Sequence, residues 1–182
     1  LGYGFDASTF PTFLGPLARA YYFATAQLSP EERERRKALF GGFREGLRPL
    51  APYYWTLPGQ SRLLEIPVTT MPVLRLPFHL SYLMYLARFS EGLAIAYLRT
   101  AIALCRATGT EPSFLLHPLD LIGGDLAPQL GFFPGMSLSS AHKVRIFHRT
   151  LRCLADHFEL VPMGEHARRI TGRELRAIAA AA

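Results

Sequence analysis

The run from Ser113 to Asp120 is the sequence feature that most constrains the fold. Its first four residues are apolar enough for a short buried strand, which ends at His117 and is followed by Pro118. Proline cannot donate to a strand ladder, so the strand is expected to stop there. In parallel α/β folds functional side chains lie where strands end, and a histidine can exchange a proton near neutral pH. The run predicts an α/β fold with His117 as a candidate acid–base residue, or as a strand-end histidine bonded to a neighbouring carbonyl.

Short apolar segments alternate with helical patterns along the chain, which favours a parallel α/β sheet or barrel. Strands are expected at 2–5, 63–69, 113–116 and 158–161, and helices at 30–47, 77–89, 90–107, 140–157 and 164–169. Thr171 and Glu174 have capping-box spacing, which predicts a last helix through the alanine-rich end. Four strands are too few for a closed barrel, so further strands are expected from elsewhere.

The composition fits one folded domain, because 182 residues that are 49% hydrophobic can bury a core. The sequence shows neither a transmembrane stretch nor a signal-peptide pattern, which predicts a cytoplasmic or membrane-peripheral location. Cys105 and Cys153 lack metal or redox spacing and are expected to be buried thiols in a reducing compartment. The net charge of +6 comes from scattered arginines, most of which alternate with glutamates, so no nucleic-acid partner is expected.

Three motifs follow one another in the sequence: GFDASTFP at 4–11, LEIPVTTMP at 64–72 and FLLHP at 114–118. In type and order they resemble motifs of the polysaccharide deacetylases of the NodB-homology family, and the resemblance covers residues 1–167. It implies the C-terminal portion of a distorted, TIM-like (β/α) barrel of NodB type. The chain, 1–182, is then a single incomplete domain in which residues 168–182 are expected to form a C-terminal helix.

The resemblance implies a hydrolase that removes an acetyl or formyl group from an amino sugar in a glycan or glycolipid. In this family a divalent metal, of the zinc type, activates water, an aspartate acts as base, and a histidine protonates the departing amine. The family's metal ligands come from an Asp-Asp motif and a His-x-x-x-His motif, and neither motif occurs in this sequence. The metal-binding half is therefore expected outside this chain, which alone should be inactive.

The last motif carries the site residues that the resemblance transfers. His117 is the implied general acid, and Asp120 is expected either to orient His117 or to cap the turn. Phe114 stands where the family has a leucine that helps line the acyl pocket, and Leu116 is expected to contact substrate beside it.

Three further polar residues each have two interpretations. Asp6 is expected to form a turn with Ser8, with a substrate contact as the alternative. His79 lies near a predicted helix start, either lining the cleft or bonded within the helix end. Glu65 lies between apolar residues of a predicted strand, where it is expected to be structural, holding an arginine or facing the barrel rim.

Residues 10–57 join aromatic side chains to a basic helical segment. Such a combination can rest on a membrane surface and receive a lipid-linked sugar, although the aromatic side chains can also pack against the barrel. The partner is therefore expected to be an amino-sugar glycan or a lipid-linked sugar, with possible peripheral membrane contact. The alternative function is a non-catalytic sugar- or lipid-binding remnant of the fold, or a subunit completed by a partner.

Overall fold

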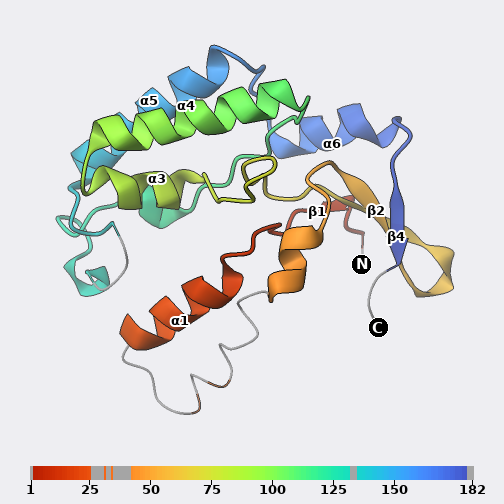
Figure 1. Cartoon of the computed structure of the whole chain (residues 1–182), viewed down its shortest axis with the longest axis horizontal. Coiled ribbons are helices and arrows are strands. Elements are labelled where there is room, and N and C mark those ends of the chain that lie inside the picture. The colour runs from red at the N-terminus through yellow and green to blue at the C-terminus, as the bar shows by residue number, and fades with distance from the viewer. Residues whose placement is uncertain (1, 26–30, 32–33, 35–41, 132–134, 180–182) are drawn as a thin grey trace.

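The computed structural model of the chain describes residues 2–25, 31, 34, 42–131 and 135–179. A small sheet and a group of packed helices lie side by side along the long axis, and helix α1 projects from them (Figure 1). The fold is mixed α/β, as expected. In chain order the elements are β1 (Phe5–Asp6), α1 (Gly15–Thr25), the 3-10 helix η2 (Phe43–Leu47), β2 (Tyr53–Thr56), η3 (Pro58–Gln60), β3 (Arg62–Glu65), α3 (Leu80–Ala87), α4 (Glu91–Ala107), η4 (Pro118–Asp120), η5 (Pro128–Leu130), α5 (Ser140–Ala155), α6 (Met163–Thr171) and β4 (Ala177–Ala179).

The sheet has the strand order β1-β3-β2-β4 and is mixed, whereas a parallel arrangement was expected. Strands β1 and β3 are parallel, but β2 and β3 form an antiparallel hairpin in which Tyr53 lies opposite Glu65. The hairpin loop turns at Gly59, whose φ of 79° suits glycine. Such a short connection can join only antiparallel neighbours. Pro52 and Pro58 flank β2 and leave its backbone free to pair, so a strand forms in a segment where none was predicted.

The extended backbone continues beyond the assigned ends of β1 and β3. The amide of Val68 donates to the carbonyl of Thr9 at 2.9 Å, and the Thr70 hydroxyl donates to the carbonyl of Pro11 at 2.6 Å. Two neighbouring stretches, 6–11 and 66–70, therefore run together from the sheet toward α3. A strand was predicted at 63–69. Only its first residues, up to Glu65, belong to β3, and the rest is extended backbone beyond the sheet.

The predicted strand at 113–116 is not a strand of the sheet. Its backbone is tied instead to two different segments. Ser113 accepts from the amide of Thr69 at 3.0 Å, and Leu115 accepts from the amide of Leu80 at 3.1 Å. The amide of Ser113 donates to the side-chain hydroxyl of Thr69 at 2.7 Å, not to a backbone carbonyl. A regular ladder is therefore not formed, although the segment still delivers His117 to the start of α3.

The C-terminal part of the chain also differs from the prediction. Residues 158–161 form no strand, and the expected final helix is absent, because α6 ends at Thr171 and residues Ala177–Ala179 form β4 beside β2. The amide of Tyr54 donates to the carbonyl of Arg176 at 2.8 Å. Pairing with the open edge of β2 outweighs the intrinsic helix preference of alanine here.

The helices predicted at 77–89, 90–107, 140–157 and 164–169 are confirmed with small shifts at their ends. Ser90 and Ser139 cap two of them, since each hydroxyl accepts from the backbone amide three residues later, at 3.2 and 3.3 Å. The predicted helix at 30–47 lies mostly outside the described residues, and its last part is η2. No described helix is long and apolar enough to cross a membrane.

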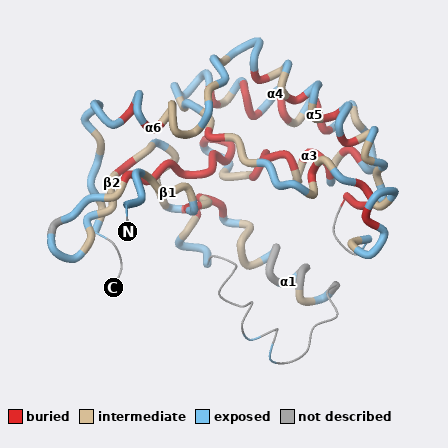
Figure 2. The backbone as a smooth tube through the Cα atoms, turned by 180° about the vertical axis from the view of Figure 1, so that it is seen from behind, coloured by how far each residue is buried: buried red, intermediate tan, exposed pale blue. Residues whose placement is uncertain are grey.

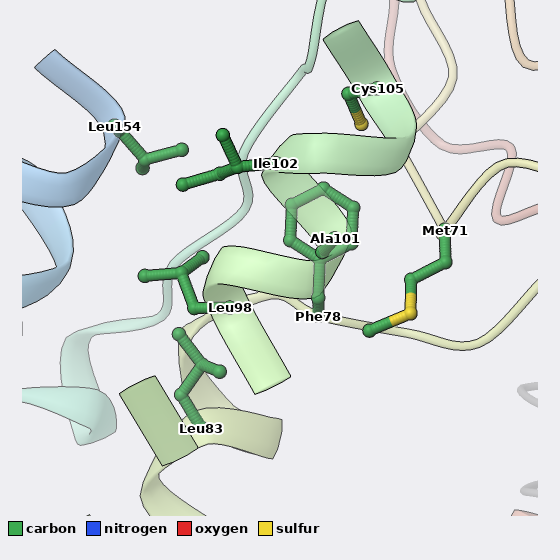
Figure 3. Close-up of a cluster of buried hydrophobic side chains, with 8 residues drawn as sticks. All are labelled: Met71, Phe78, Leu83, Leu98, Ala101, Ile102, Cys105 and Leu154. Atoms are coloured by element: carbon green, nitrogen blue, oxygen red, sulfur yellow. The ribbon is translucent and has the colours of Figure 1, made fainter. Parts of the chain in front are cut away.

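The core of the helical part lies between α3, α4 and α5 (Figure 3). Figure 2 shows buried residues along the central extended segments and on the facing sides of these helices. A second cluster, in which Ala167 and Ile170 of α6 pack on Leu64 and Ile66, covers the sheet. The largest central cluster is made by Met71, Phe78, Leu83, Leu98, Ala101, Ile102, Cys105 and Leu154.

Candidate active site

His117 and Asp120 are held together by the tight turn that Pro118 opens. The carboxyl oxygen Oδ2 of Asp120 accepts from the backbone amide of His117 at 2.8 Å. The carbonyl of His117 accepts in return from the amide of Asp120 at 2.9 Å. Asp120 is buried, whereas the His117 side chain keeps 52% of its surface exposed. The turn thus places a buried carboxyl group directly beneath a histidine that solvent can reach.

The His117 ring is oriented through its Nδ1 atom. This atom lies 3.1 Å from the hydroxyl of Ser81 in the first turn of α3, and 3.6 Å from Oδ2 of Asp120. The first distance is a hydrogen bond, and the second allows a charge interaction when the ring is protonated. Because Nδ1 faces the protein, Nε2 is the ring nitrogen available to a bound molecule.

His79 packs beside His117 and is buried. Its ring centroid lies 5.9 Å from that of His117, 4.8 Å from that of Tyr82 and 5.3 Å from that of Phe10. Burial lowers the pKa of His79 to about 4, and the positive charge that His117 can carry acts in the same direction, against the opposing effect of Asp120. His79 is therefore neutral at neutral pH, and its Nδ1 atom has no hydrogen-bond partner among the described residues.

Lys143 fixes the loop that follows His117. This α5 side chain is buried, and its Nζ atom donates to the carbonyl oxygens of Leu119 and Ile122, both at 2.8 Å, and to the sulfur of Met136 at 3.4 Å. Burial lowers the pKa of Lys143, which the nearby carboxyl groups, Asp120 foremost, oppose. The ammonium group thus binds the backbone on both sides of Asp120.

The same loop is also fastened to the first turn of α5. The amide of Gly123 donates to the hydroxyl of Ser140 at 2.8 Å. Oδ1 of Asp125 accepts from the amide and the hydroxyl of Ser140, at 2.8 and 2.9 Å. These hydrogen bonds lower the pKa of Asp125. Residues 118–125 are therefore held in place from α5.

The structure brings together three of the predicted site residues, His117, Asp120 and His79. Leu116 is exposed beside them. Phe114 instead packs between the two helical core clusters, with its ring 6.1 Å from that of Phe78.

Asp6 lies away from this group, at the sheet. Its carboxyl oxygens accept from the amide of Ala7 at 2.9 Å and from the hydroxyl of Ser8 at 2.7 Å, which is the expected turn.

Glu65 is fully buried, and both of its oxygens are used within the sheet. Oε1 accepts from the amide of Thr9 at 3.0 Å, and Oε2 accepts from the indole nitrogen of Trp55 at 2.9 Å. The expected arginine is not among its described partners. Glu65 therefore fastens the segment after β1 to the β2–β3 hairpin.

Sequence reasoning missed Ser81, Tyr82, Phe10 and Lys143. The first three come next to His117 and His79 only through tertiary packing. A signal for Lys143 was present, since positions 143, 146, 150 and 154 share one helix face and the other three are uncharged. A lysine in such a stripe indicates a buried ammonium group that donates hydrogen bonds within the protein.

The described residues do not suit a resident divalent metal. No three histidine, cysteine, aspartate or glutamate side chains within them gather as a potential metal site. Oδ2 of Asp120 accepts from the backbone amide of His117. Comparison of the sequence and structure with protein-family models, curated proteins and solved structures found no significant match.

Proposed function

We propose that this chain carries the proton donor of a metal-dependent hydrolase that removes an N-acyl group, acetyl or formyl, from an amino sugar. The proposal joins the resemblance to the NodB-type deacetylases, including the (β/α) barrel it implies, to the geometry around His117. The observation that carries it is the half-exposed imidazole whose Nδ1 is held by Ser81 and Asp120 while Nε2 stays available.

In the proposed reaction water adds to the amide carbonyl, the C–N bond breaks, and the amine nitrogen leaves. A departing amine must gain a proton, and the protonated His117 donates one from Nε2. Asp120 and Ser81 keep the ring in the orientation for this transfer. His79 is uncharged at neutral pH, so it adds no positive charge that would oppose protonation of His117.

The metal of the proposed enzyme would be held by residues outside the described part of the chain, or by a second subunit. When bound, it would polarise the acyl carbonyl and activate the attacking water. The described residues contribute the acid, its orientation and the packed wall around it.

The test is release of acetate or formate from N-acylated amino sugars by the full-length protein supplied with zinc. Substituting His117→Asn should lower kcat by about 100-fold or more with little change in KM, because the acid acts in the transition state. The matched control is His157→Asn, at an exposed histidine just after α5, which should leave kcat unchanged. An unaffected His117→Asn enzyme would remove the acid assignment. An intact, zinc-loaded protein that binds amino sugars but releases no acid would instead establish the non-catalytic binding role.

A further inference from the structure

Six large apolar side chains are exposed on three neighbouring segments of the described chain. Each exposes between 40% and 80% of its surface. We term this surface the apolar rim; its members are Phe13 just before α1, Leu17 in α1, Phe43 and Leu47 in η2, and Val73 and Leu74 in the loop between β3 and α3. Helix α1 lies on the opposite side of the central segments from α4 and α5 (Figures 1 and 2). The rim therefore belongs to a face that the packed helices do not cover.

Specific contacts join the three segments into one surface. The ring of Phe13 lies on Gly46, where an added Cβ atom would stand 2.2 Å from the ring. The hydroxyl of Thr12 donates to the carbonyl of Arg75 at 2.8 Å, and the guanidinium of Arg75 donates to the carbonyl of Arg48 at 2.9 Å. The rim is thus held as a unit by side-chain contacts beneath it.

The loop that carries Val73 is strained. Val73 has φ of 69° and Arg75 has φ of 56°, a region that glycine or asparagine adopts at lower cost. A β-branched residue at positive φ is a genuine outlier, and here its side chain is also 80% exposed. The amide of Arg75 donates to the carbonyl of Met71 at 2.8 Å and keeps the turn closed. Strain that presents an apolar side chain to the outside indicates a surface that something binds.

Arginine outnumbers acidic residues in the segments that form the rim. Arg44 is exposed in η2, and Arg48 and Arg75 lie half-buried at its base. Within the described stretches 12–25, 42–48 and 71–77 the single acidic residue is Glu45, which is paired with Arg48. Apolar side chains bordered by more arginines than carboxylates fit a surface that is apolar inside and negatively charged outside.

We propose that the apolar rim docks on a bilayer of anionic phospholipid. The six apolar side chains enter the headgroup–acyl boundary, and the exposed Arg44 contacts lipid phosphates. The rim is close to the candidate active site, since Phe10, whose ring packs on His79, precedes Phe13 by three residues. Resting on the proposed function, this docking makes a lipid-linked amino sugar the substrate class that reaches His117.

The test is co-sedimentation of the full-length protein with vesicles of mixed phosphatidylglycerol and phosphatidylcholine, and with vesicles of phosphatidylcholine alone. Binding should be stronger to the anionic vesicles and should weaken as salt is added. The double variant Val73→Asp, Leu74→Asp should bind at least about tenfold more weakly. Its matched control is Leu126→Asp, Leu160→Asp, which places two charges at exposed leucines outside the rim and should bind as the wild type does.

A second variant guards against a folding defect. Val73→Asn suits the positive φ, so it should unfold at or above the temperature of the wild type while binding anionic vesicles severalfold more weakly. Equal binding by wild type and both rim variants would overturn the proposal, as would absence of binding at low salt. A self-association that the rim variants abolish, without vesicle binding, would assign the rim to a second copy of the chain.

Vesicle binding is measured without catalysis, so the two proposals fail separately. A protein that binds anionic vesicles through the rim but releases no acyl group would contradict the proposed function and support docking through the rim. Acyl release from a soluble amino sugar without vesicle binding would support the proposed function and contradict docking through the rim.

Discussion

The Nζ atom of Lys143 lies 2.8 Å from the carbonyl oxygen of Leu119, the residue directly before Asp120. A buried ammonium group on α5 therefore holds the backbone of the turn that carries the candidate acid. The bond joins two elements 24 residues apart in sequence, and a second one to Ile122 repeats it on the other side of Asp120.

We expect Lys143→Met to lower the free energy of unfolding by about 2 kcal/mol. Methionine fills similar space but leaves two partly buried carbonyl oxygens without their donor, and desolvation of such groups is costly. Urea unfolding followed by the fluorescence of Trp55, the single tryptophan, measures the change. The control Arg152→Met, at an exposed position on the same helix, should change stability by no more than about 0.5 kcal/mol. Equal effects of the two substitutions would contradict the role given to Lys143.

Gly123→Ala should destabilise the protein by about 2–3 kcal/mol, because a Cβ atom there would stand 2.2 Å from the carbonyl oxygen of Leu138 and 2.6 Å from the amide of Ser140. Both are backbone atoms, so relief requires the loop to move away from α5. Gly164→Ala in α6 is the matched substitution, since nothing lies within 4 Å of its added Cβ. Helix propensity should make that variant more stable by about 0.5 kcal/mol. Thermal unfolding of the two proteins compares them directly.

Replacement of Glu65 by glutamine should destabilise the contact between the segment after β1 and the β2–β3 hairpin. Both oxygens of Glu65 accept, from Thr9 and Trp55, and an amide side chain can offer only one acceptor oxygen. We expect a loss of about 2 kcal/mol and a shifted emission spectrum of Trp55 in the folded protein. Thr56→Val, at an exposed position of the same hairpin, serves as the control. An unchanged emission spectrum would show that the indole does not depend on this carboxyl group.

Because of His79, the free energy of unfolding should fall as the pH drops from neutral toward 4. Its pKa is about 4 in the folded protein and 6.5 when exposed, so within this window the unfolded chain binds the proton more readily. Stability from this group is complete above the unfolded pKa and is lost on acidification, by about 3 kcal/mol in all. His79→Phe should therefore flatten the curve of unfolding free energy against pH relative to the wild type, and His157→Gln should not. Parallel wild-type and His79→Phe curves would refute the burial effect.

Helices were predicted well because their signals are local. Ser90 and Ser139 cap α4 and α5, and the apolar spacing of both helices matches the side that they bury. Strand β2 was missed because its aromatic residues are surrounded by prolines, and its place depends on a partner, β3. The Pro58–Gly59 turn between them was the available signal for a hairpin. Strand β4 was mistaken for helix, since its alanines acquire strand conformation only through the edge of β2.

The candidate site was predicted in part for the same reason. The histidine–proline step marked His117, and Asp120 follows it closely enough for a local turn to join them. Ser81 lies 36 residues before His117 in sequence, and no local pattern indicates that its hydroxyl meets the ring.

The sheet pairs residues 5–6 with 64–65, residues 53–56 with 62–65, and residues 54–56 with 177–179. A ribosome makes β2 long before β4, so one edge of β2 is open until residues 177–179 have been made. Helices α3 and α4, by contrast, are separated by a few residues and can pack as soon as both have emerged, because nearby contacts close quickly. Until β4 arrives, the backbone groups along the edge of β2 can pair with other chains. The order of synthesis thus leaves the β2 edge of a nascent copy of this protein open to aggregation.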